Sequence, residues 1–145
     1  MTPSETDARM GAYNLDKLDY IGTVDAGFIR VRVSVLTVEQ EIDVSVVIGQ
    51  GQCQLFLFTL NPKEADLLST RLLRVSESAL DCSDTFETPS GHFSVSSKGQ
   101  RIGVAVSGRD AVFHFTLNPV HAQKLSNYLA QSVEIVLSGF EPKRD

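Results

Sequence analysis

The sequence predicts an α+β fold made by tandem duplication of a β-β-β(-β)-α unit, and three observations support this. Residues 58–62 read FTLNP, and residues 115–119 read FTLNP again, 57 positions later. The segments before each copy alternate between apolar and polar residues, the period of a strand with one buried face. The segments after each copy carry apolar residues at helical spacing. We therefore expect a mainly antiparallel sheet of six to eight strands, with two long helices packed on one face.

The first unit is expected at residues 20–83, after a flexible or short helical segment at residues 1–19. Alternation and turn residues predict its strands at 20–24, 28–36 and 41–48, and a run that is apolar on both faces predicts a further strand at 54–60. A helix is predicted to begin at Pro62, because a proline in the first turn has no N–H to lose. Asn61 can cap this helix, and Glu64 stands where the second residue of a capping box belongs.

The second unit is expected at residues 84–140, followed by a tail at residues 141–145. Its strands are predicted at 92–97, 102–106 and 111–117, with a short extra strand as an option at 85–87. Asn118 and Pro119 repeat the helix start. The two units together are expected to form one compact domain. Whether their strands make one continuous sheet or two sheets meeting at an angle stays open.

The composition bounds the class of protein. At 42% hydrophobic and 21% charged residues, the chain is an ordinary globular one that can bury a core without disulfides. The net charge of −5 opposes general affinity for phosphate polyanions. The opening MTPSETDARM lacks the regions of a signal peptide, and no apolar run reaches the ~18–20 residues of a membrane helix. We expect a cytoplasmic protein without membrane contact, whose Cys53 and Cys82 are free thiols.

Motifs of catalysis and cofactor binding are not found in the sequence. It contains no glycine-rich nucleotide loop, no zinc-protease pattern and no nucleophile elbow. A metal site would need two or three of the histidines at 92, 114 and 121 to converge with a carboxylate. Nothing in the spacing supports a nucleophilic pair of a cysteine with a histidine. We therefore expect no enzymatic activity, no cofactor and no metal. The remaining enzymatic alternative is a site of scattered polar residues between the two units.

The informative surface is the sheet face turned away from the helices. Alternation predicts that the candidate binding residues on it are Phe28, Arg30, Arg32, Leu55, Leu57, His92, Arg101 and His114. The hairpin through residues 37–40 is expected to bring the two strand arginines beside Glu41 and Asp43, a pairing of modest energy. In the second unit the same face carries small and nearly uncharged side chains, and Gly103 and Ala105 leave room for another chain to approach. We expect this face to be partly covered, most simply by a second copy of the protein.

These features favour a non-enzymatic protein-binding module, such as an adaptor, an inhibitor or a chaperone-like protein, that acts through this face as a homodimer. The alternative is binding of single-stranded nucleic acid on the same face. Tandem sheet-plus-helix repeats of this general plan occur in some single-strand binders of the PUR-repeat and whirly type, to which the likeness is one of plan and not of sequence motifs. The net charge opposes this alternative, and few aromatic residues are available for base stacking.

Overall fold

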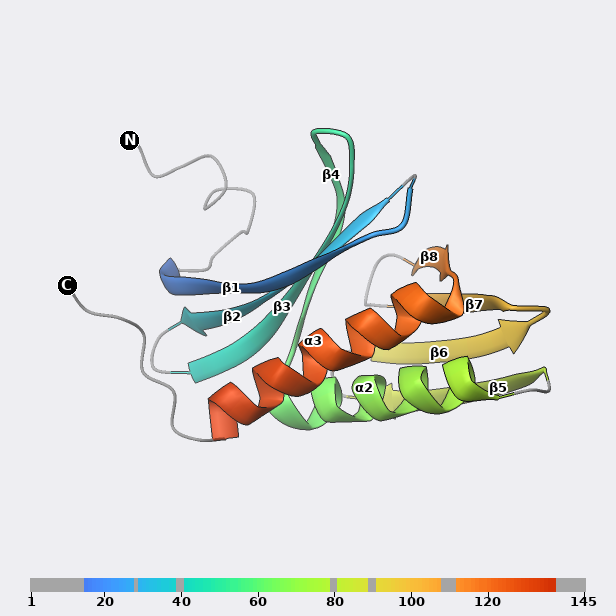
Figure 1. Cartoon of the computed structure of the whole chain (residues 1–145). Coiled ribbons are helices and arrows are strands. Elements are labelled where there is room, and N and C mark those ends of the chain that lie inside the picture. The colour runs from blue at the N-terminus through green and yellow to red at the C-terminus, as the bar shows by residue number, and fades with distance from the viewer. Residues whose placement is uncertain are drawn as a thin grey trace.

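The computed structural model of the chain describes residues 15–27, 29–38, 41–78, 81–88, 91–107 and 112–137 (Figure 1). Four strands and a helix come first: β1 (Leu15–Asp25), β2 (Arg30–Val38), β3 (Glu41–Gln50), β4 (Cys53–Leu60) and α2 (Pro62–Glu77). Four strands and a helix follow: β5 (Cys82–Thr88), β6 (Gly91–Lys98), β7 (Arg101–Ser107), β8 (Val112–Leu117) and α3 (Pro119–Leu137). The predicted α+β class, with antiparallel strands and two long helices, is confirmed.

The strands form two four-stranded antiparallel sheets and not one sheet. Sheet A has the order β1-β2-β3-β4, and sheet B has the order β5-β6-β7-β8. Strands that follow each other along the chain pair directly, so every connection within a sheet is a hairpin. The strands are divided in this way because β4 leads into helix α2, and the chain returns from that helix at a distance from β4 (Figure 1).

The boundaries differ from the predictions at the start of each half. β1 is longer than the strand predicted at 20–24, and it takes in residues 15–19, which we expected to be flexible or short helical. Residues 1–14 and the predicted tail at 141–145 lie outside the described residues. The optional strand before the second unit is present as β5, and the predicted boundary at residue 84 falls inside it.

Both helices begin at a proline that follows an asparagine cap, as predicted. The side chain of Asn61 accepts a hydrogen bond from the Glu64 backbone N–H at 2.8 Å, and the Glu64 carboxylate accepts one from the Asn61 N–H at 2.9 Å. At α3, Asn118 Oδ1 accepts a hydrogen bond from the His121 N–H at 2.7 Å. These bonds satisfy N–H groups that have no partner within the helix, and they fix where each helix leaves its strand.

Each helix packs mainly on the sheet of the other half of the chain. Helix α2 follows sheet A but packs most closely on β5 and β6, whereas α3 follows sheet B but packs most closely on β1 and β2. Arg71 and Arg74 of α2 form ion pairs with Asp84 of β5. The Tyr128 ring of α3 lies so close to Gly22 of β1 that an added Cβ would come within 2.5 Å of it. The two halves therefore exchange helices, and neither sheet is covered by its own helix alone.

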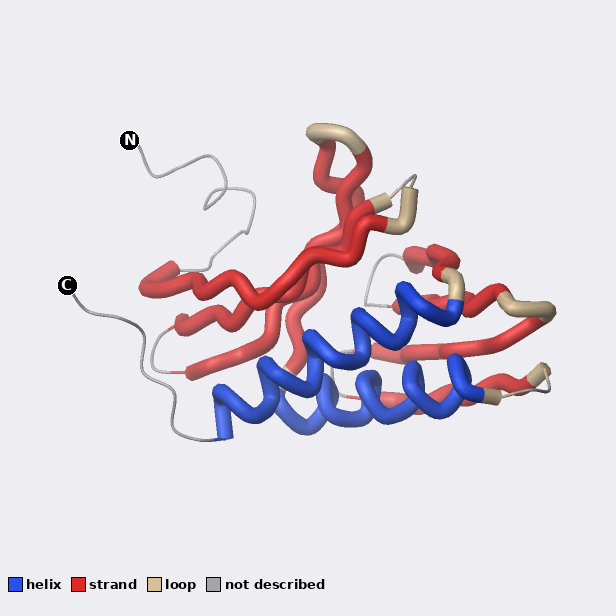
Figure 2. Tube along the Cα trace, viewed as in Figure 1, coloured by secondary structure: helices blue, strands red, loops and turns tan. Residues whose placement is uncertain are grey.

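The two helices lie side by side and touch through a pair of buried serines (Figure 2). Ser69 Oγ is 2.9 Å from the Ser126 carbonyl oxygen, and Ser126 Oγ is 2.7 Å from the Ser69 carbonyl oxygen. The two hydroxyl oxygens are 3.1 Å apart. Small side chains let the helices approach closely here, and the reciprocal bonds satisfy both buried hydroxyls.

A single hydrophobic core lies between the helices and the two sheets, with buried members from both halves of the chain. Aromatic rings join the sheets. Phe56 of β4 stacks on Phe113 of β8, with ring centroids 5.1 Å apart and an angle of 11° between the planes. Phe58 of β4 meets Phe93 of β6 at 5.9 Å. The end of sheet A formed by β4 is thus packed against sheet B, and the two sheets share one core.

Candidate functional site

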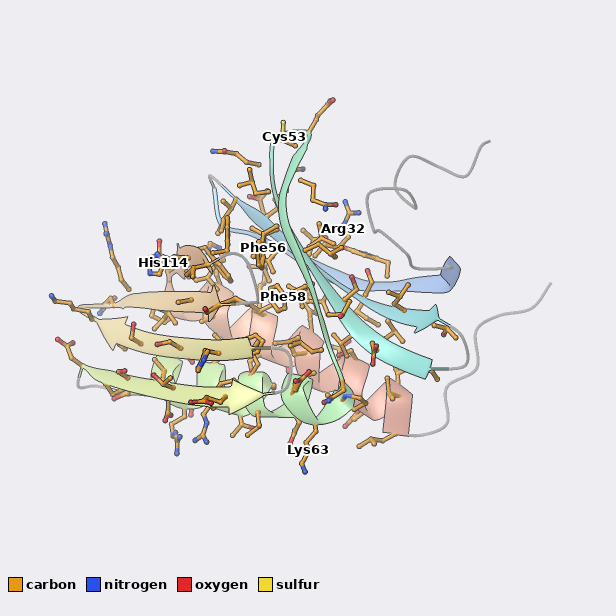
Figure 3. All side chains as sticks on the ribbon, turned by 180° about the vertical axis from the view of Figure 1, so that it is seen from behind. Arg32, Cys53, Phe56, Phe58, Lys63 and His114 are labelled. Carbon is orange, nitrogen blue, oxygen red and sulfur yellow. The ribbon has the colours of Figure 1, made fainter. Side chains whose placement is uncertain are left out.

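Both sheets turn one face away from the helices, and Figure 3 views the molecule from that side, with the sheets in front of the helices. Strand register determines which side chains share this face. In sheet A, Val47 lies between Arg32 and Leu57 on the neighbouring strands. In sheet B, Ala105 lies between Ser94 and His114. We define the helix-free surface as Arg30, Arg32, Val47, Leu55 and Leu57 of sheet A with His92, Ser94, Lys98, Arg101, Gly103, Ala105, Val112 and His114 of sheet B.

Four of the five site residues predicted in the first unit lie together on sheet A, and the fifth, Phe28, lies outside the described residues. Arg30 and Arg32 are exposed, and Leu57 is half-buried. Leu55 is 43% exposed, because the pairing of β3 with β4 shifts by one residue at this point. Such a bulge leaves the extra residue out of the ladder. The structure therefore places two cations and two leucines on one sheet face.

The strand register does not bring these arginines beside Glu41 and Asp43, as we expected from the sequence. β2 ends at Val38 and β3 begins at Glu41, so antiparallel pairing places the acids beside the C-terminal end of β2. The arginines lie near the other end of β2, opposite Gly49 and Val47. Cross-strand pairing in a hairpin is counted outward from its turn, and residues far from the turn on one strand meet residues equally far from it on the other.

The site residues predicted in the second unit all lie on sheet B but do not form a tight cluster. His92 and His114 are exposed on the two strands that flank β7. Arg101 begins β7 at the opposite end and pairs with Lys98. His92 Nδ1 lies 3.7 Å from the Glu87 carboxylate. The structure thus brings the predicted residues together as two sets, one on each sheet, and not as one compact site.

Gly103 and Ala105 are half-buried and form the floor of the helix-free surface on sheet B. A Cβ added to Gly103 would come within 3.2 Å of Ser96 Oγ and 3.6 Å of His114 Nε2. The glycine therefore allows these two polar side chains to approach each other across β7. The room that the sequence predicts here is bounded by a hydroxyl on one side and an imidazole on the other.

The exposed cations of the helix-free surface are not neutralised. Arg32, Lys98 and Arg101 have no acidic partner among the residues that the structure describes. On the helix side, by contrast, Arg71 and Arg74 are paired with an acid of β5. Although the molecule has a net charge of −5, its helix-free surface thus presents unpaired positive charge. Such a patch attracts carboxylates or phosphates of a partner.

Sequence reasoning missed that part of the outward face of sheet A is buried. Ser34 and Ser45 point away from the core as predicted, yet they are only 3% and 1% exposed. Ser45 Oγ has no hydrogen-bond partner among the residues that the structure describes. The neighbouring Leu36 on the same face is also buried, although no helix of the described part of the chain lies over it. Alternation predicts which face of the sheet a residue takes, but it does not predict whether that face is covered at that point.

A separate open pocket of about 480 Å³ lies where α2 begins and α3 ends. Its lining is mostly apolar and comprises Asn61, Pro62, Lys63, Asp66, Val133 and Leu137. It contains neither a histidine nor a cysteine. Its chemistry is that of a small apolar recess, and none of the predicted site residues lines it.

No model of a known protein family matches this chain, and no curated protein is found to be similar to it. In the ranges that the structure describes, no helix is long and apolar enough to span a membrane. Across the same ranges, no group of three or more His, Cys, Asp or Glu residues is arranged to hold a metal ion. The geometry of the helix-free surface is thus the main evidence on function.

Proposed function

We propose that the protein is a non-enzymatic binding module that holds a partner protein on the helix-free surface, as an adaptor, inhibitor or chaperone-like protein. The observation that carries this proposal is the combination of exposed apolar side chains with unpaired cations on one side. Leu55 and Val112 are 43% and 70% exposed. Arg32 and Arg101 are exposed without an acidic partner among the described residues. A protein surface with apolar anchors and carboxylates complements such a patch.

We also propose that the two halves are copies of one unit, related by an internal two-fold axis. In a two-fold arrangement, a residue near the axis contacts its own equivalent. Ser69 and Ser126 are 57 residues apart, the spacing of the two FTLNP segments, and they bond to each other reciprocally. Phe56 and Phe113 have the same spacing and stack on each other. The helix-free surface then consists of two related halves whose side chains have diverged.

Charge reversal on the helix-free surface is expected to abolish capture of the partner. The double variant Arg32→Glu/Arg101→Glu replaces two attractive contacts by repulsive ones, and we expect retention of the partner to fall at least about tenfold. Wild-type and variant proteins would be immobilised and exposed to lysate of the source cells, and bound proteins would be compared quantitatively by mass spectrometry. Lys124→Glu, which reverses an exposed cation of α3 on the helix side, is the matched control.

The outcomes of this capture experiment are distinct. A protein retained by the wild type and by the Lys124→Glu variant, but not by the double variant, supports the proposal. Equal retention by all three proteins contradicts it, as does a wild-type protein that retains nothing. Circular dichroism spectra of the variants would establish that both remain folded, as expected for substitutions at exposed positions.

Single-stranded nucleic acid is the second candidate ligand, and the same unpaired cations favour it. The order of four strands and a helix, repeated once, also keeps the likeness of plan to tandem sheet-helix binders. Phe56 and Phe113 lie at the junction of the sheets, but they are half-buried and stack on each other, which leaves them poorly placed to stack on bases.

A gel-shift experiment with labelled poly-dT at low salt separates the two candidates. From the net charge of −5 we expect no retardation at micromolar protein. Retardation by the wild type that is lost in the Arg32→Glu/Arg101→Glu variant and weakened by added salt would instead assign the helix-free surface to nucleic acid.

A further inference from the structure

The β3–β4 hairpin extends away from the rest of sheet A, as seen at the top of Figure 1 and around the labelled Cys53 in Figure 3. We call residues 49–55 the β-arm. Pairing of β2 with β3 ends at Gly49, so the residues beyond it have no neighbouring strand from β2. Residues 50–55 are all exposed. The β-arm is therefore accessible to another molecule on more than one side.

The β-arm is a formed hairpin. Gln50 pairs with Cys53, and Gly51 in the turn has a φ of 62°, a left-handed conformation that glycine adopts without strain. The Arg30 guanidinium of β2 donates a hydrogen bond to the Gly51 carbonyl oxygen and ties the turn to the sheet. A hairpin held in this way loses little conformational freedom when it binds.

The composition of the β-arm indicates what it contacts. Residues 49–55 read GQGQCQL and carry no charged side chain, in a chain with a net charge of −5. Nucleic acid would require lysines and arginines there. In a contact between two identical copies, side chains near the two-fold axis face their own equivalents, so that a charge at this position would meet a like charge. The β-arm carries no charged side chain of its own and extends away from the rest of an acidic protein, so it avoids this repulsion.

The outer edge of the β-arm is also available for pairing. β4 is an edge strand of sheet A and pairs with β3 alone among the described strands. Soluble proteins protect edge strands with charges, prolines or bulges. Of these devices β4 has only the register shift at Leu55, and it carries neither a charge nor a proline. Leu55 is 43% exposed beside this edge.

We propose that the β-arm pairs with the β-arm of a second copy of this chain, edge to edge and antiparallel through residues 53–55 of β4, with Leu55 of each copy packed against the other. The proposal rests on the proposed function, because a homodimer is one of the protein contacts that the helix-free surface would make. It assigns Arg30 a supporting role, since the guanidinium holds the turn in place for pairing.

The test is the oligomeric state of the full chain, measured by size-exclusion chromatography with light scattering at micromolar protein. We expect the wild type to be a dimer, and Leu55→Glu to raise the dissociation constant by about a hundredfold, because two carboxylates would meet at the axis. Leu73→Glu is the matched control, since Leu73 on α2 is 42% exposed and lies on the helix side. Gln54→Glu, at an exposed polar position, should also weaken the dimer without affecting the fold.

A second readout uses the cysteine of the β-arm. A bifunctional maleimide is expected to link Cys53 of two wild-type copies, and Cys53→Ser and Leu55→Glu should each abolish the linked species. A monomeric wild type, or Leu55→Glu and Gln54→Glu variants that remain dimers, would overturn the proposal. If a monomeric wild type still captures a partner that the Arg32→Glu/Arg101→Glu variant loses, the contact between arms fails and the proposed function stands. If the wild type is a dimer but captures no partner, the contact between arms stands and the proposed function fails.

Discussion

Phe93→Ala is expected to lower the free energy of unfolding by about 3–5 kcal/mol. Phe93 is 2% exposed and stands where the two sheets meet. Its ring stacks on Phe86 of β5 with centroids 5.3 Å apart, and it contacts Phe58 of β4 at 5.9 Å. Truncation would remove contacts within sheet B and across to sheet A, and it would leave a cavity that the surrounding strands fill poorly.

Urea unfolding followed by far-ultraviolet circular dichroism measures this effect. We expect a single transition whose midpoint falls while its slope is unchanged, because the two halves share one core and unfold together. Phe86→Ala is the control, since Phe86 is only half-buried and its loss should cost less. A cost for Phe93→Ala below about 1 kcal/mol, or two separate transitions, would contradict a shared core.

Gly22→Ala is expected to destabilise the protein by about 1–3 kcal/mol, the usual cost of overpacking. The added Cβ would lie 2.5 Å from the Tyr128 ring, closer than carbon atoms approach without displacement. Gly22 is in β1 and Tyr128 is in α3, so the clash arises only because α3 packs on the sheet of the other half. The substitution is thus a direct probe of the helix exchange.

A double-mutant cycle isolates this contact. In the background of Tyr128→Ala, the Gly22→Ala substitution should cost much less, since the ring that it meets is gone. Gly103→Ala is the matched glycine control in sheet B, where the nearest atom to an added Cβ is Ser96 Oγ at 3.2 Å and the neighbouring side chains can adjust. If Gly22→Ala costs the same with and without the ring, α3 does not pack on β1 in solution.

Local signals predicted most of the elements. The apolar alternation of β2, β3 and β7 is visible within each strand, β4 is a run that is apolar on both faces, and the cap at Asn61 is a short-range signal completed three residues later. Residues 15–19 were harder to predict because Leu15 and Leu18 stand at helical spacing. In the structure this segment pairs with β2 and is part of β1. Long-range strand pairing outweighs a weak local preference.

The candidate surface was predicted in part. Alternation places Arg32 and Leu57 on the face turned away from the helices, and the structure has them there on either side of Val47. The prediction of which residues lie beside Arg30 and Arg32 was wrong, because cross-strand neighbours depend on the register of the strands and not only on the face that a residue takes. The burial of Ser45 was also missed, because alternation predicts which face a residue takes and not whether that face is covered. The partner protein, the homodimer and the lack of enzymatic activity stay predictions.

Local patterns along the chain are enough to predict most of its elements: strands from a period of two, helices from a period near 3.6, and helix starts from an asparagine followed by a proline. Three arrangements become visible only in the folded chain: the division into two sheets, the packing of each helix mainly on the other half's sheet, and the contact of Ser69 with Ser126. Periodicity and capping are interactions between residues a few positions apart, whereas these arrangements are contacts between segments that no local pattern relates.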